Sequence, residues 1–280
     1  MHRHLTTLVL LIAISPAAHA QQPRVLVFSK TVQYRHASIP NGIAAIKQLG
    51  AQNGFAVDAT EDATAFSQKN LRRYAAVVFM STTGDVLDAA QQDDFERYIQ
   101  AGGGYVGIHS GTDTEYDWPW YGRLAGAYFN GHPQNPNVRK GRYRTLDSTH
   151  VSTQGFPAQF DREDEFYNFK SIDPTIHVLV EIDETSYEGG TNGAHHPMSW
   201  YHDFDGGRAW YTNMGHPDAT YTEPLFLRHL LGGIRYAIGN GTIDFNRARP
   251  EENRFTRVVL AEKLNEPIEL AILPGERVRF

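Results

Sequence analysis

A histidine stands at the centre of a glycine-flanked turn near the middle of the chain. The segment Gly107-Ile108-His109-Ser110-Gly111 resembles a nucleophile elbow, a sharp turn that joins a buried strand to a helix and presents one side chain at its tip. An imidazole in that position does not act as an ordinary acyl-transfer nucleophile. We therefore expect His109 to be a metal ligand, a general base or a general acid. A structural histidine that hydrogen-bonds nearby backbone is the alternative.

Other polar side chains that could take part in chemistry lie at the ends of predicted strands or in loops with Gly and Pro. Besides His109, they are His36, Asp113, His132, Glu165, His195, His196 and His216. Several imidazoles with a carboxylate suit a catalytic zinc or a similar divalent ion, and they equally suit metal-free acid–base catalysis. The chain has no HExxH segment or other compact metal motif, so spacing alone does not separate these two alternatives.

Aromatic side chains gather directly after this turn. They are Tyr116, Trp118, Trp120, Tyr121, Tyr128 and Phe129. Aromatic rings beside polar groups can cover the C–H faces of a sugar while the polar groups bind its hydroxyls. The sequence is compatible with a sugar-binding cleft of this kind and with a core that is rich in aromatic residues.

The elements that must position these residues follow an alternating pattern in the first half of the chain. Strands are predicted over 25–28, 55–62, 75–80 and 104–109, and helices over 39–50 and 88–102. Short connections between them predict an α/β domain of the flavodoxin-like type, with a mostly parallel sheet flanked by helices. Since sites in such sheets lie at the carboxyl ends of strands, we expect residues 29–36, 81–85 and 109–113 to converge on one cleft.

The second half adds a strand over 175–183, a hairpin of residues 198–213 and an amphipathic helix from Pro224 to Gly239. Residues 256–280 alternate apolar and polar side chains around a Pro-Gly turn, which predicts antiparallel β structure. We therefore divide the chain into an α/β domain, residues 21–240, and a linker with the β-rich start of a further domain, residues 241–280. Packing of these last strands on the α/β domain is the alternative.

The first twenty residues have the features of a signal peptide. Arg3 precedes an apolar stretch, residues 5–15, and Ala18-His19-Ala20 is a small-x-small cleavage site. We expect cleavage after Ala20, a secreted or periplasmic protein, and no stable membrane anchor. The formal charge of −6 is not that of a nucleic-acid-binding protein. The chain has no Cys, which excludes disulfides, thiol nucleophiles and Cys-ligated zinc.

Seven segments, in matching order, resemble the ThuA-like family, the trehalose-utilisation type of domain. They are RVLVFSKTVQYRHASI, GGGYVGIHSGTD, GHP, DEFY, HPMSW, GGRAWYTNMGH and FLRHLLGGIRYAIG, within about Arg24–Gly239. The resemblance implies the fold of class I glutamine amidotransferases without their Cys nucleophile, so amidotransferase activity is not expected. The C-terminal segment more faintly resembles the opening of a β-propeller of the glucose/sorbosone dehydrogenase type. The resemblance also implies functional roles for a set of polar residues and a cleft position for Trp200; the polar residues are His36, His109, Glu165, His196 and His216.

The family resemblance further implies a role in carbohydrate metabolism, beside oxidoreductases that make 3-keto derivatives of disaccharides. We expect an enzyme that acts on a sugar or 3-keto-sugar as an isomerase, lyase or hydrolase; a non-catalytic carbohydrate-binding module of a larger sugar-oxidising protein is the alternative. The expected catalytic residues are His109, Glu165 and His196. The expected substrate-binding residues are His36, Asp113, Trp118, Trp120, Trp200 and His216. A divalent metal, zinc first, is the expected cofactor, with His109, His132 and His196 as ligands, and no nucleotide cofactor is expected.

Overall fold

The computed structural model describes residues 22–248, 271–273 and 277–279 of the chain. The expected signal peptide lies outside these residues. Within the described part, no helix is both long and apolar enough to cross a membrane. The predicted antiparallel β structure near the C-terminus is present as the pair β12 (Ala271–Leu273) and β13 (Arg277–Arg279).

A nine-stranded mixed sheet runs through the α/β domain in the order β2-β1-β3-β4-β11-β10-β9-β6-β7. Its first five strands are parallel, and the order β2-β1-β3-β4 is that of flavodoxin-like sheets. They are β2 (Ala56–Thr60), β1 (Arg24–Phe28), β3 (Ala76–Met80), β4 (Gly104–Ile108) and β11 (Gly207–Thr212). The predicted α/β fold is therefore confirmed.

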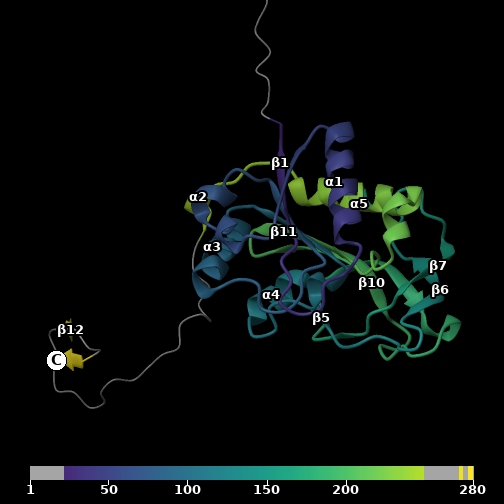
Figure 1. The fold of residues 1–280 in the computed structure, drawn as a ribbon. Helices are drawn as coiled ribbons and strands as arrows, with labels where there is room; N and C mark the ends of the chain where they lie inside the picture. The colour runs from purple at the N-terminus through teal and green to yellow at the C-terminus, as the bar shows by residue number, and fades with distance from the viewer. Residues whose placement is uncertain (1–21, 249–270, 274–276, 280) are drawn as a thin grey trace, which may run out of the picture.

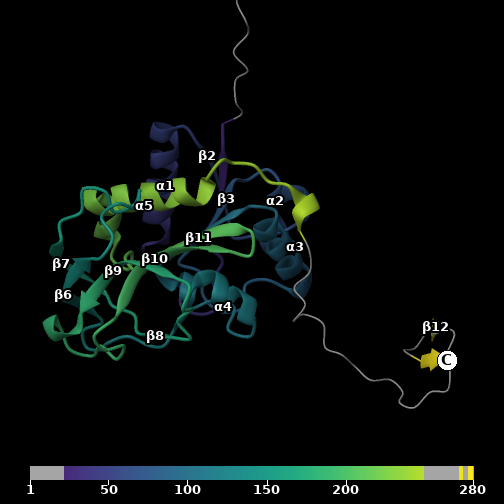
Figure 2. The same cartoon turned by 180° about the vertical axis from the view of Figure 1, so that it is seen from behind.

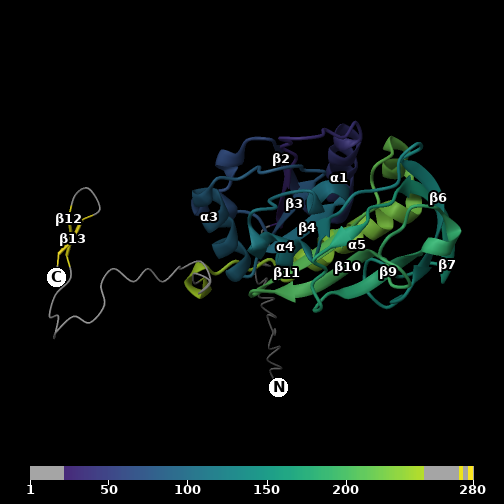
Figure 3. The same cartoon turned by 90° about the horizontal axis from the view of Figure 1, so that it is seen from below.

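The other half of the sheet is antiparallel, and it carries the strand that supplies Glu165. Its strands are β10 (Pro197–Phe204), β9 (His177–Asp183), β6 (Val138–Thr145) and β7 (Gln159–Glu165). The predicted hairpin is the β10–β11 pair, which joins the two halves. Figure 3 follows the sheet from β2 to the β6–β7 edge. Beside it, β5 (Tyr128–Phe129) pairs with β8 (Phe169–Lys170).

Helices cover both faces of the parallel half (Figures 1 and 2). One face carries α1 (Ile39–Asn53) and α5 (Pro224–Ile238), and the other carries α2 (Gln68–Leu71), α3 (Ala89–Gln100) and α4 (Pro119–Ala125). Short 3₁₀ turns connect the elements: η1 (Ala63–Ala65), η2 (His109–Thr112), η3 (Glu184–Ser186), η4 (Asp218–Thr222) and η5 (Phe245–Arg247).

The two faces have separate apolar cores because side chains alternate along each strand. In β1, Val25 and Val27 pack in the core beneath α1 and α5, whereas Leu26 and Phe28 pack in the core beneath α2 and α3. Both sets are fully or almost fully buried, so the central strands are apolar throughout, as is usual for parallel sheets covered on two sides. This double cover fixes the strand ends from which the polar loops start.

Candidate functional site

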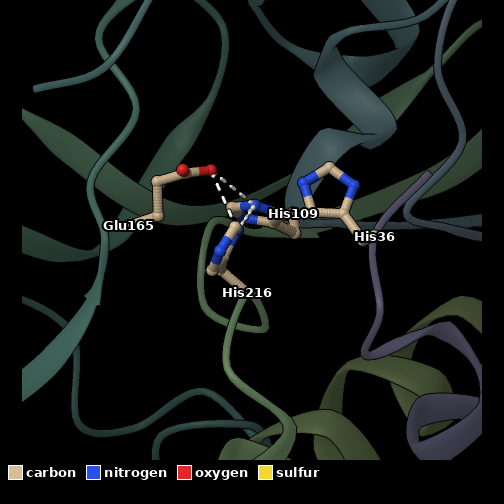
Figure 4. A group of neighbouring side chains, drawn as sticks. All are labelled: His36, His109, Glu165 and His216. Carbon is tan, nitrogen blue, oxygen red and sulfur yellow. Dashed lines mark hydrogen bonds and ion pairs between the residues drawn. The ribbon is translucent and has the colours of Figure 1, made fainter. Parts of the chain in front are cut away.

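Four polar side chains from distant parts of the chain meet at one end of the sheet. They are His36, His109, Glu165 and His216, and one ligand-type atom of each lies within 4.8 Å of those of the others. Figure 4 shows the imidazoles of His109 and His216 directed at the Glu165 carboxylate, with His36 beside them. Three of the four are buried and His216 is partly buried.

The fold brings these residues together because β1, β4 and β11 are parallel, so that the carboxyl ends of these strands lie on the same side of the sheet, at the ends of its strands. His36 lies in the β1–α1 loop, His109 directly follows β4, and His216 follows β11. Glu165 is the last residue of β7, at the far edge of the sheet. The loops after the parallel strands thus converge as expected, and the antiparallel half of the sheet adds Glu165 to the group.

His109 adopts the backbone conformation of an elbow. Its φ is +50°, in the left-handed region that non-glycine residues rarely adopt. The Tyr211 hydroxyl holds the turn by donating to the His109 carbonyl at 2.7 Å. Gly107 permits close packing beneath it, since an added Cβ would lie 2.6 Å from the Tyr105 hydroxyl and 2.9 Å from the Tyr211 ring. The strained conformation therefore presents a side chain at the strand end.

Hydrogen bonding orients the His109 ring. Its Nδ1 donates to the carbonyl of Asn213 at 2.7 Å, which leaves Nε2 to face the other site residues. A backbone acceptor on one ring nitrogen is the usual arrangement when the other nitrogen binds a metal. The same bond ties the β4 turn to the segment after β11.

Three atoms in the group have the spacing of metal ligands. Glu165 Oε2 lies 3.2 Å from His109 Nε2 and 3.0 Å from His216 Nδ1, and the two nitrogens are 3.3 Å apart. Ligands bound to a tetrahedral zinc at about 2 Å stand about 3.3 Å from one another. The donor set, two imidazoles and a carboxylate with a third imidazole alongside, therefore fits a divalent ion.

Further residues support this group, and Asn137 and Tyr167 were not anticipated as site residues. Asn137 donates to Glu165 Oε1 at 2.6 Å. The Tyr167 ring packs against His109 with centroids 4.3 Å apart, and its hydroxyl lies 3.5 Å from His36 Nε2. Tyr167 lies two residues after Glu165 in the DEFY segment, so its closeness in sequence to an expected site residue could have indicated it. His132, an expected ligand, lies at the edge of the group with Nδ1 3.5 Å from Glu165 Oε1.

Burial and mutual contact set the protonation states of the group. Burial, with the neighbouring imidazoles of His109 and His216, lowers the pKa of His36 from 6.5 to about 2, which keeps its ring neutral. Burial alone raises the pKa of Glu165, but hydrogen bonds with His109 and His216 outweigh it and hold that pKa well below its usual range. Burial alone lowers the pKa of His216, whereas contact with the Glu165 carboxylate produces a net raised pKa. The site therefore combines a carboxylate with a neutral imidazole.

The structure places His196 and His195 apart from this group. The buried His196 ring bonds the Tyr167 carbonyl through Nε2 at 2.7 Å and approaches Glu184 Oε1 through Nδ1 at 2.8 Å. Both ring nitrogens thus have protein partners, and the ring supports the backbone behind the site. His195 is 95% exposed, with its Nδ1 3.8 Å from Glu181.

The tryptophans expected in a sugar cleft lie in the core. Trp118, Trp120 and Trp200 are 8%, 2% and 1% exposed. Trp200 Nε1 donates to the Ala125 carbonyl at 2.8 Å, and Trp120 Nε1 donates to Asp205 at 3.0 Å. Asp113 accepts from the Tyr116 hydroxyl at 2.6 Å, and burial raises the pKa of its carboxyl. The aromatic segment after the elbow thus mainly fills the space between helix and sheet.

Comparison with known proteins identifies the family. The model of the ThuA family, described as trehalose utilisation, matches residues 24–237. The chain belongs to the ThuA family. No curated protein sequence matches it. The comparisons give no support to the expected propeller resemblance of residues 241–280, since the family match ends before that segment.

Solved structures of ThuA-like proteins share the fold. One from Bacteroides uniformis has a TM-score of 0.67 and 22% identity, over 83% of this chain and 99% of its own. One from Parabacteroides merdae has a TM-score of 0.62 and 20% identity, over 80% of this chain and 92% of its own. At these identities the likeness shows a shared fold alone.

Proposed function

We propose that this ThuA-family protein is a metal-dependent enzyme that moves a proton next to the carbonyl group of a sugar or 3-keto-sugar. The observation that carries the proposal is the convergence of His36, His109, Glu165 and His216 from four chain segments into one buried group. Burying a titratable group costs folding free energy unless the group is paired or hydrogen-bonded, and such groups gather at catalytic centres. The family description, trehalose utilisation, supplies the substrate class.

His109, Glu165 and His216 would hold the divalent ion, because their facing atoms have ligand spacing. Asn137 and the Asn213 carbonyl orient two of these ligands from behind. Three protein ligands leave an open position, as in catalytic zinc sites. When bound, such an ion polarises a carbonyl oxygen and stabilises the negative charge of an enediolate.

His36 is the residue to which we assign the proton transfer. Its ring lies edge-on to both His109 and His216, with centroids 4.7 and 5.3 Å away, and its nitrogens face the hydroxyls of Ser110 at 3.3 Å and Tyr167 at 3.5 Å. Its neutral imidazole is a weak base because of its burial, so its uptake of a proton from the carbon next to a ketone would rely on the bound ion, which would acidify that carbon by polarising the carbonyl. Returning that proton to the adjoining position gives isomerisation, and loss of a leaving group from the neighbouring carbon gives elimination.

Two variants separate the assigned roles. His36→Asn is expected to retain bound metal and lose turnover of a 3-keto-disaccharide by about 100-fold or more, since it lacks only the proton-transfer group. His109→Ala is expected to lose both metal and turnover while it remains folded by circular dichroism. Wild-type turnover in His109→Ala would refute the proposal.

A carbohydrate-binding module without catalysis is the second candidate. This candidate predicts that the wild-type chain binds sugars but turns over none, and that His36→Asn binds them as the wild type does. The convergence of a carboxylate with neutral imidazole in the buried group favours the enzyme.

We also propose that the protein works outside the cytoplasm after cleavage near Ala20. The support is the sequence pattern of residues 1–20. N-terminal sequencing of the protein from the periplasmic or culture fraction tests this directly. A chain that keeps residues 1–20 in the cytoplasmic fraction would contradict it.

A further inference from the structure

An exposed aromatic ring stands beside the buried site. Tyr34 is 64% exposed, and among the described residues it is the one Phe, Tyr or Trp side chain in the exposed class. Its ring lies edge-on to the ring of His36, with centroids 4.8 Å apart and planes at 83°. The β1–α1 loop thus carries a buried proton-transfer residue and, two positions earlier, an aromatic face open to solvent.

This loop is held in place through Thr83, which follows β3. The Val32 N–H donates to the Thr83 carbonyl at 2.8 Å, and the Thr83 hydroxyl donates to the Tyr34 carbonyl at 2.9 Å. Gln33 N–H donates to the same hydroxyl at 3.3 Å. The backbone on either side of the ring is therefore fixed to the central sheet, although the ring itself is uncovered.

The close approach of this loop to the sheet also depends on Gly84. Its φ is +74°, and a Cβ there would lie 3.2 Å from Val32 Cβ and 3.1 Å from Gln33 Cγ. Val32 is 58% exposed, so two apolar side chains of one anchored loop remain in water. Exposed apolar side chains that gather beside a polar site are typical of ligand contacts, whereas single ones scattered over a surface are not.

We propose that Tyr34, with Val32 beside it, stacks on the sugar ring that does not react when the substrate contains two rings. This inference rests on the proposed function, because it places the reacting ring at His36 and its neighbours. The second sugar ring of a disaccharide, extending from the site past His36, would meet the Tyr34 ring. An aromatic face can cover the C–H groups of such a sugar. Tyr34 then takes the part that the sequence had suggested for the buried tryptophans.

The test compares two probes that share the reacting ring, 3-keto-trehalose and 3-keto-glucose. Isothermal titration calorimetry and steady-state kinetics are run on the full chain, wild type and Tyr34→Ala. We expect Tyr34→Ala to weaken 3-keto-trehalose binding by about tenfold, with a matching rise in KM and little change in kcat, because one stacking contact is lost. Binding of 3-keto-glucose should stay the same. Tyr34→Phe and Tyr34→Trp keep a ring and should restore most of the lost affinity.

Leu146→Ala is the matched control. Leu146 is 54% exposed and follows β6 at the end opposite Val138, which pairs with Glu165. The Leu146→Ala variant should bind both probes as the wild type does. The stacking role would be overturned if Tyr34→Ala bound both probes as tightly as the wild type does. It would also be overturned if Tyr34→Ala lost affinity for both probes to the same extent, or if the wild type did not prefer the disaccharide. Loss of turnover in His36→Asn alongside any of these outcomes would leave the proposed function standing.

Discussion

The buried carboxylate of Asp164 accepts a hydrogen bond from the backbone N–H of His216 at 3.1 Å. It also accepts from the N–H of Gly215 at 3.1 Å and from that of Glu165 at 3.0 Å. One side chain therefore fixes the backbone on both sides of the Glu165–His216 contact, although it lies outside that contact. The Arg162 guanidinium neutralises it at 3.1 Å. Asp164 is a positioning residue for the site.

Replacing Asp164 by Asn should damage both stability and the site. The variant loses the charge that faces buried Arg162, and its amide cannot accept at every position that the carboxylate serves. We expect the free energy of unfolding to fall by about 2–4 kcal/mol and metal affinity to fall by about 10–100-fold. Denaturant unfolding and competitive metal titration measure the two effects.

Asp161→Asn is the control on the same strand. Asp161 is 42% exposed and meets Lys140 and Arg142 at the surface, so its loss should cost less than about 1 kcal/mol. It should leave metal affinity unchanged. Wild-type metal affinity in Asp164→Asn would contradict the positioning role.

A second prediction concerns stability at acid pH. Burial lowers the pKa of His229 from 6.5 to about 3, while its ring bonds the Ser152 carbonyl and the Ser199 hydroxyl. Between pH 6.5 and 3 the unfolded chain binds a proton at this residue and the native chain does not. Stability therefore falls with falling pH in that window, by up to about 1.4 kcal/mol per pH unit from this residue alone.

The His229→Gln variant isolates this contribution. It cannot titrate at this position, so its unfolding free energy should fall less steeply than that of the wild type between pH 6.5 and 5. Urea unfolding at several pH values supplies the comparison. Parallel curves for the two proteins would show that the His229 ring is protonated in the native state.

A third prediction separates the buried tryptophans from the exposed tyrosine. Trp200 is 1% exposed, stacks on Tyr211 with centroids 4.3 Å apart, and bonds the Ala125 carbonyl. Trp200→Ala should lower the free energy of unfolding by about 3–5 kcal/mol. Tyr34→Ala should change it by less than about 0.5 kcal/mol, since its ring covers little of the protein. Thermal unfolding of the two variants checks the contrast, and a small effect of Trp200→Ala would refute a core role.

The sequence predicts the parallel half of the sheet well because its signals are local. Apolar runs such as 25–28 and 75–80 are bounded by turns, and Asp88 and Gln91 form a capping box at the start of α3. The antiparallel strands β6 and β7 carry alternating charged residues on a half-exposed edge, so their patterns are weaker. The pairing of β6 with β9, and of β7 with β6, depends on contacts between distant segments that periodicity does not encode.

Within the site, His36, His109, Glu165 and His216 are all expected from the sequence, whereas the supporting residues Asn137 and Tyr167 are not. His36 and His109 follow predicted strands, and parallel topology brings such ends together. His196 is also a histidine in a predicted loop, yet Glu184 and the Tyr167 carbonyl contact its two ring nitrogens. Only the fold distinguishes a supporting histidine from one that faces the group. Likewise, whether an aromatic side chain is buried, as Trp120 is, or exposed, as Tyr34 is, depends on tertiary packing.

The most direct test of the account is the metal content of the purified protein, measured by inductively coupled plasma mass spectrometry beside two variants. His109→Ala removes a proposed ligand, and His195→Ala removes an imidazole that is 95% exposed and apart from the group. The account predicts about one divalent ion per chain in the wild type and in His195→Ala, and little in His109→Ala. A wild type that remains metal-free after incubation with zinc, manganese and nickel would contradict the metal-dependent site, as would an ion that His109→Ala retains in full.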